Sequence, residues 1–151
     1  ASPSGDELGE AFGLAVAQRA VEAGEVVAKA LGVETHSFWQ FLATAYGVTE
    51  GSHVERIVQG YGRQAFPEPD SLTHRYFTED IPFGLVTWNS LANQIGLRLP
   101  LTEAFIRISG ILCDADFEAT GRTARVLGLE GGNAAGIKTA FLDGVSPSSP
   151  S

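Results

Sequence analysis

Apolar residues recur along this chain at intervals of three and four, the spacing that places them on one face of an α-helix. The first such stretch runs from Leu8 to Leu31; it opens with a capping box of Ser4 and Glu7 and stops at Gly32. A second stretch, from Ser37 to Tyr46, repeats the pattern over a shorter length. We therefore expect two amphipathic helices in the first third of the chain.

The rest of the chain predicts further helices separated by turn residues. A capping box of Ser52 and Glu55 opens a short helix, and the glycines and prolines from Gly60 to Asp70 predict a loop. Four further helices are predicted. The first starts at Pro82 and has Leu85, Val86, Trp88 and Leu91 as apolar positions, and the second starts at Pro100 and runs toward Cys113. The third spans Asp116 to Leu127, and the fourth follows a cap at Asn133. No segment alternates with a period of two, so the predicted fold class is all-α.

The domain organisation follows from length and from the two ends. A chain of 151 residues has room for one domain with a proper core, and we expect a single-domain helical bundle over residues 6–144. Small polar residues and prolines predict a loose N-terminal end over residues 1–5 and a disordered tail over 145–151. Methionine is absent, also at position 1, which leaves open whether the chain is a fragment or a complete protein.

Composition narrows the classes of partner. With 44% hydrophobic and 19% charged residues the chain is an ordinary soluble protein, and no apolar run approaches the roughly 18 residues of a membrane span. A net charge of −8 argues against nucleic acid and anionic membranes as partners. The single cysteine, Cys113, lies in an apolar context typical of a small buried hydrophobe, and it favours a cytoplasmic location.

The densest candidate chemistry lies in Leu72–Val86. Here His74 and Arg75 precede an aromatic pair and two adjacent acids, Glu79 and Asp80, directly before Pro82. Arginine offers a planar fork of donors that fits a carboxylate, and acids can orient a histidine or exchange a proton with it. Alternatively, the acids only complement the dipole of a helix that starts at Pro82, and Arg75 with Asp80 is a plain ion pair.

The run His74–Val86 resembles the signature of the α-helical C-terminal domain of the octopine/nopaline (opine) dehydrogenase family. Order and spacing remain similar over about Ala15 to Gly144, and the central run is the specific part. The other similar segments are residues 25–33, 38–47, 121–129 and 141–144.

This resemblance implies a function. Members of the family couple a 2-oxo acid reductively to the amine of an amino acid using NAD(P)H. The chain would be the substrate-binding half, with Arg75 contacting a substrate carboxylate and Asp80 partnering the catalytic histidine; Tyr76 and Trp88 are further substrate-binding candidates. The family's histidine belongs to a segment expected before this chain, as does the nucleotide-binding domain, so the chain alone would not be a competent dehydrogenase.

We expect no cofactor or metal site within the chain itself. The glycine-rich stretch Gly128–Gly136 follows a predicted helix rather than a strand, which favours a turn and helix cap over a dinucleotide cradle. No Cys/His cluster has metal-ligand spacing. His36 and His53 lie at the edges of predicted helices, where an exposed or capping role is the simpler interpretation.

A second function remains open from the residues. The helical domain can stand alone as a cofactor-independent isomerase or cyclase, with Asp80, Glu79 or His74 as general base and Arg75 as anion clamp. It can also serve as a ligand-binding module or as a dimerisation module, and the latter use would make a homodimer. In either case we expect Arg75 and Asp80 to face a common cleft, on an approach segment free of helical hydrogen bonding.

Overall fold

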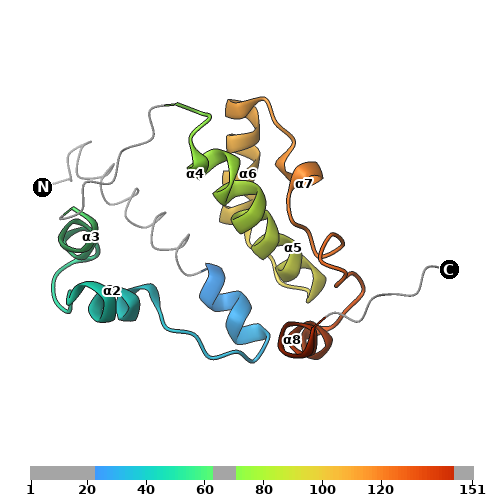
Figure 1. The fold of residues 1–151 in the computed structure, drawn as a ribbon, viewed down its shortest axis with the longest axis horizontal. Coiled ribbons are helices and arrows are strands. Elements are labelled where there is room, and N and C mark those ends of the chain that lie inside the picture. The colour runs from blue at the N-terminus through green and yellow to red at the C-terminus, as the bar shows by residue number, and fades with distance from the viewer. Residues whose placement is uncertain (1–22, 63–70, 145–151) are drawn as a thin grey trace, which may run out of the picture. The chain divides into compact units, whose positions relative to one another are not determined.

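The computed structural model describes residues 23–62 and 71–144 (Figure 1). Every regular element in these ranges is helical and none is a strand, which confirms the predicted all-α fold class. Contacts divide the described residues into two compact units, 23–25 with 35–62 and 26–34 with 71–144. Each unit is described by itself below, and the predicted domain boundaries stay a prediction.

The described part of the first unit holds two helices, α2 (Phe38–Tyr46) and α3 (His53–Tyr61). Both begin with a capping box, at Ser37 and at Ser52, and the predicted box of Ser52 with Glu55 is therefore confirmed. The two helices pack closely: Leu42 is fully buried, and a side chain at Gly60 would start 3.0 Å from the Cδ2 atom of Leu42.

Residues 23–30 form the described end of the predicted first helix. The chain turns at Gly32, whose φ of 65° is a left-handed conformation that suits glycine, so the predicted stop is confirmed. The Nζ atom of Lys138 donates a hydrogen bond to the Gly32 carbonyl, and both residues belong to the second unit. The predicted helix start at Leu8, the capping box before it and both chain ends lie outside the described residues.

The second unit is organised around one turn of π-helix, η1 (Asp80–Leu85). It contacts four neighbours: α4 (Arg75–Thr78), α5 (Val86–Gln94), α6 (Pro100–Cys113) and α7 (Phe117–Thr120). The buried cluster at this centre consists of Ile81, Val86, Ile106 and Phe117, with Leu85 and Cys113 packed against it. Cys113 is half-buried there, as a small apolar residue would be.

The prediction that Pro82 starts a helix is wrong. Helical backbone already begins at Arg75, and Pro82 lies inside η1. In this wide turn the Val86 N–H donates to the Ile81 carbonyl, and the Pro82 carbonyl instead accepts a 2.9 Å hydrogen bond from the Arg122 N–H. A contact from far along the chain therefore takes the place of the local hydrogen bond that the Pro82 carbonyl would accept in a regular α-helix.

The predicted helix from Asp116 to Leu127 is also wrong, since α7 is a single turn. Gly121 follows it in extended conformation and lies so close to η1 that a Cβ atom would stand 2.7 Å from the Pro82 oxygen and 2.8 Å from Val86 Cγ1. Extended chain at Gly121 is what brings the Arg122 N–H to Pro82. Tertiary packing here overrides a helical sequence pattern.

The other predicted boundaries of this unit are confirmed. Helix α6 begins at Pro100 and ends at Cys113, and α5 is followed by Gly96 with a φ of 78°. Helix α8 (Ala134–Asp143) is capped by Asn133, whose Oδ1 atom accepts a 2.9 Å hydrogen bond from the Gly136 N–H.

Candidate functional site

His74 stands at the start of the candidate segment as a helix cap. Its Nδ1 atom accepts a 3.3 Å hydrogen bond from the Tyr76 N–H, and the two rings meet edge to face with 4.5 Å between their centroids. The ring thus holds the first turn of α4 in place. This contact gives His74 a structural role beside the acid–base role that the sequence leaves open.

Arg75 pairs with Glu79 rather than with Asp80. The Nε atom of Arg75 lies 3.7 Å from a Glu79 carboxylate oxygen, one helical turn along α4, and the two side chains are 65% and 58% exposed. Exposed pairs of this kind contribute about 0–1 kcal/mol, so the contact is easily exchanged for another. The guanidinium is therefore accessible to an anionic ligand.

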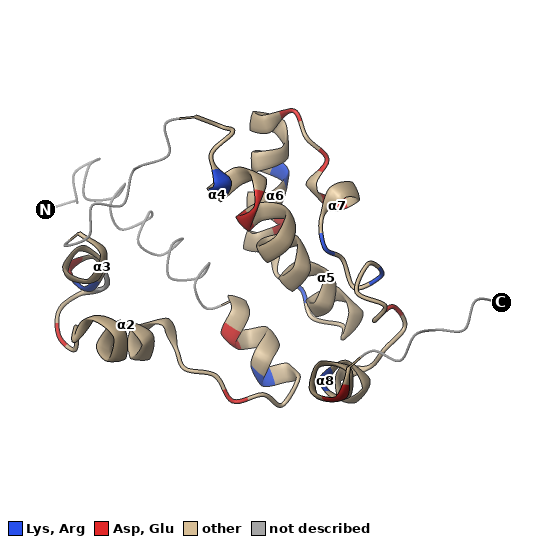
Figure 2. Cartoon of the chain, viewed as in Figure 1, with Lys and Arg blue, Asp and Glu red and all other residues tan. Residues whose placement is uncertain are grey.

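Asp80 opens η1 and is exposed, as are Tyr76 and Trp88. The apolar residues between them, Ile81 and Pro82, are buried. Figure 2 shows basic and acidic positions next to each other at α4. The segment therefore places Ile81 and Pro82 in the core and presents its charged residues, with Tyr76 and Trp88, to solvent.

The expected approach segment without helical hydrogen bonds does not exist. Arg75 begins α4 and Asp80 begins η1, so both residues are carried on helical backbone. A common cleft for these two side chains stays a prediction. What the segment does have is a π-helical turn, a feature often found at functional sites because it shifts side chains out of α-helical register.

Sequence reasoning assigned no role to Arg122, which the structure brings to this segment. Its backbone N–H binds the Pro82 carbonyl, and its guanidinium carbon lies 5.3 Å from the centre of the Phe83 ring. A cation over an aromatic face is attracted by the ring's electron density. The only sequence feature that points to this contact is the pair Gly121-Arg122, because a glycine allows two backbone segments to approach closely next to a cationic side chain.

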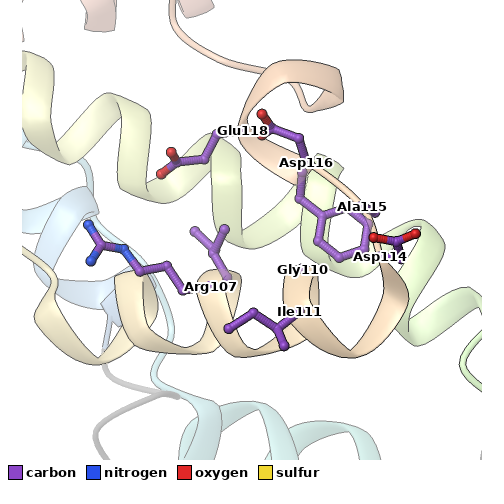
Figure 3. A pocket seen from close by; sticks show the side chains of 9 residues that line it. Arg107, Gly110, Ile111, Asp114, Ala115, Asp116 and Glu118 are labelled. Atoms are coloured by element: carbon purple, nitrogen blue, oxygen red, sulfur yellow. The ribbon is translucent and has the colours of Figure 1, made fainter.

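An open groove of about 520 Å³ lies between α6 and α7 (Figure 3). Arg107 lines it from α6, and the acids Asp114, Asp116 and Glu118 line it from α7 and the turn before it. Asp116 is already used in the fold, because its Oδ1 atom accepts a 2.9 Å hydrogen bond from the Ala119 N–H. Neither Arg75 nor Asp80 lines this groove.

The described residues do not fit a dinucleotide. The glycine-rich stretch before α8 follows turns, and the first turn of that helix is already capped by Asn133. In dinucleotide-binding folds, the pyrophosphate binds at the free N-terminus of a helix that follows a strand. Within residues 23–62 and 71–144 there is also no group of three His, Cys, Asp or Glu side chains placed to hold a metal ion, and none of the described helices is long and apolar enough to cross a membrane.

The second unit is therefore an all-α domain with an exposed arginine and exposed acids around a π-helical turn. Residues 13–113 match the family model of the NAD/NADP octopine/nopaline dehydrogenase, alpha-helical domain, and the chain belongs to this family. The match includes the whole segment His74–Val86.

Named proteins similar to this chain are about 30% identical to it. Opine dehydrogenase of Arthrobacter sp. (strain 1C) is 32% identical over 114 residues, which cover 76% of this chain and 32% of that protein. Protein ocs of Agrobacterium tumefaciens (strain Ach5) is 30% identical over 79% of this chain and 33% of its own length. Vitopine synthase of Allorhizobium ampelinum (strain ATCC BAA-846 / DSM 112012 / S4) is 31% identical over 72% of this chain and 30% of its own length. The chain thus spans about a third of the length of these relatives.

Proposed function

We propose that this chain is the substrate-binding helical half of an opine-dehydrogenase-like oxidoreductase, which couples a 2-oxo acid to the amine of an amino acid. The observation that carries the proposal is the exposure of Arg75 and Asp80 within the family-matched segment, while the apolar residues of the same segment form the core. Their exposure leaves both charged groups accessible to a ligand or to a partner side chain.

Arg75 binds the substrate carboxylate in this proposal. Its guanidinium can offer two parallel N–H donors to the two oxygens of a carboxylate, a geometry that a lysine ammonium cannot reproduce. The exposed contact to Glu79 holds the side chain near α4 without closing it to solvent. The incoming carboxylate then replaces or shares a weak ion pair rather than a buried one.

Asp80 orients and stabilises the histidine that exchanges a proton with the substrate oxygen. Among the described residues no salt bridge joins Asp80, so its carboxylate is open to such a partner. Because the described glycine-rich turn does not fit a dinucleotide, the proposal assigns NAD(P) to a separate nucleotide-binding domain, and no step in this chain passes through it.

A chimaera tests the function directly. This helical region would replace the matching region of the Arthrobacter opine dehydrogenase, and NADH consumption would be followed with a 2-oxo acid and an amino acid together and singly. We expect turnover only with both substrates, and a loss of kcat of about 100-fold or more in Asp80→Asn, the scale of an acid–base contribution.

Asp143→Asn is the matched control, because Asp143 is an exposed acid at the end of α8, away from the candidate segment. It should leave kcat unchanged. A folded chimaera without coupled turnover, or an Asp80→Asn chimaera as active as its parent, would contradict the proposal.

A further inference from the structure

Helix α6 has an outer face of large apolar side chains that are exposed. Its inner face, with Thr102, Ile106 and Ser109, is buried. On the other side Ile108 and Ile111 are 54% and 82% exposed, and Leu112 beside them is 53% exposed. We call Ile108, Ile111 and Leu112 the outer face of α6. Single exposed apolar residues are ordinary, whereas several within one or two helical turns form a patch of the kind that marks an interaction surface.

A cation and an acid lie at the two ends of this face. Arg107 and Asp114 are seven residues apart, which is about two helical turns. Figure 3 shows their side chains at opposite ends of this part of α6, with Ile111 between them. Both are exposed, and neither forms a salt bridge with a described residue. The face therefore has a positive end, an apolar middle and a negative end.

The negative charge of Asp114 is not explained by the end of its own helix. Asp114 caps α6 with a φ of 48°, a left-handed conformation for which glycine or asparagine is the usual choice. Its carboxylate also lies at the negative end of the helix dipole, where an acid is destabilised. A cation placed against Asp114 from outside would offset this cost.

We propose that the outer face of α6 packs against the same face of a second copy of this chain, with the two helices antiparallel about a two-fold axis. In such an arrangement one surface meets itself, so Ile108 and Ile111 of the two copies contact each other. The antiparallel direction places Arg107 of each copy beside Asp114 of the other, and the symmetry forms this ion pair twice. A parallel arrangement would instead place arginine against arginine.

The inference goes beyond the function proposed above, because Arg75 and Asp80 lie on α4 and η1 and not on this face. Stable dimers bury about 800 Å² on each copy, and one helix face with three large apolar side chains buries less. We therefore expect a weak dimer that exchanges with the monomer at roughly 10 μM to 1 mM. Unfolding measurements at lower concentrations then report on the monomer.

Sedimentation velocity of the full chain across this concentration range tests the proposal. We expect the average mass to rise with concentration from that of the monomer toward twice that value. Ile111→Lys should remove this rise, because it places a charge in the centre of the contact. Leu142→Lys makes the same kind of change at a side chain of α8 that is 73% exposed, and it should dimerise like the parent.

Three outcomes of this experiment would overturn the proposal. The first is a chain that stays monomeric throughout, as it would if another kind of partner covered this face. The second is an Ile111→Lys variant that dimerises like the parent, and the third is equal loss of the dimer in the Leu142→Lys variant.

Charge reversal tests the antiparallel register. Arg107→Glu and Asp114→Arg should each weaken dimerisation at least tenfold, because each places like charges together twice. An equimolar mixture of the two variants should dimerise like the parent, since every acid then meets a cation of the other copy. Arg125→Glu makes the same change of charge at an exposed arginine outside α6 and should have no effect.

Circular dichroism would show that the charge variants keep the helical fold. Reversed variants that dimerise like the parent, a mixture that stays monomeric, or equal weakening by Arg125→Glu would overturn the proposal.

Discussion

At the scale of single residues, Gly121 shows most clearly how the centre of the second unit is held. A Cβ atom there would lie 2.5 Å from the Phe117 carbonyl oxygen and 2.7 Å from that of Pro82, both of which are backbone atoms that cannot swing aside. We predict that Gly121→Ala lowers the free energy of unfolding by roughly 1–3 kcal/mol, the usual cost of overpacking. Denaturant unfolding measures it.

Gly84→Ala is the control for this prediction. Gly84 lies within η1, and a Cβ atom there would meet nothing within 4 Å. The variant should be as stable as the parent or slightly more stable, because alanine loses less backbone freedom on folding. Equal losses in the two variants would show that the close approach at Gly121 does not constrain the fold.

Glu55 provides a prediction about pH. Hydrogen bonds from the Ser52 N–H and O–H, each 2.8 Å to the Glu55 Oε2 atom, lower the pKa of the Glu55 carboxyl below its ordinary value. Because the folded pKa is depressed, this stabilisation is present above the unfolded pKa, about 4.3, and is lost as pH falls through the folded value. In Ser52→Ala the pKa of Glu55 should rise, as a carboxyl ¹³C titration would show. A pKa of Glu55 that does not change would mean that the Ser52 hydroxyl does not contribute to the lowered value.

At the scale of elements, α6 has one face in the core and one in solvent. Ile106 is 3% exposed and belongs to the central cluster, whereas Ile111 on the same helix is 82% exposed. We predict that Ile106→Ala costs about 2–5 kcal/mol, since it removes buried atoms and leaves a cavity. Ile111→Ala should stay within about 0.5 kcal/mol of the parent. Similar melting temperatures for the two variants would argue against the described packing of α6.

The sequence predicts helix boundaries well where the signal is local, either a capping side chain or a proline in the first helical turn. Ser52 with Glu55, Pro100 and Asn133 are such cases, and each begins its helix as expected. It fails at Pro82 and after Asp116, because the deciding contact there joins η1 to the Gly121-Arg122 pair, far along the chain. Local patterns contain no information about such a contact.

At the candidate site, too, the local sequence predicts some features and leaves others undetermined. Residue chemistry alone could not separate an ion pair from a ligand site at Arg75, and the role proposed for it comes from the family resemblance. The structure adds that the pair is with Glu79 and that it is exposed. In α5 the buried Oδ1 atom of Asn89 accepts no hydrogen bond from the described residues, and no signal in the sequence predicted this, since an asparagine within an amphipathic helix gives no indication of its hydrogen bonds.

At the scale of the whole molecule, the family match and the helical fold agree. The chain belongs to the octopine/nopaline dehydrogenase family over its alpha-helical domain and spans about a third of its named relatives. In the proposed function a separate domain binds NAD(P), and this chain binds the substrate carboxylate at Arg75, which it can do without a cofactor. That task is the central claim.

The most direct measurement is the affinity of the ¹⁵N-labelled chain for pyruvate, followed by backbone amide shifts, in the parent and in Arg75→Lys. We predict saturable binding in the parent and at least tenfold weaker binding in the variant, because an ammonium cannot form the two-bond fork. Arg98→Lys is the matched control, since Arg98 is also an exposed arginine paired with a glutamate, Glu103, at 2.7 Å; it should bind pyruvate like the parent. Arg75→Lys binding pyruvate as tightly as the parent would contradict the account.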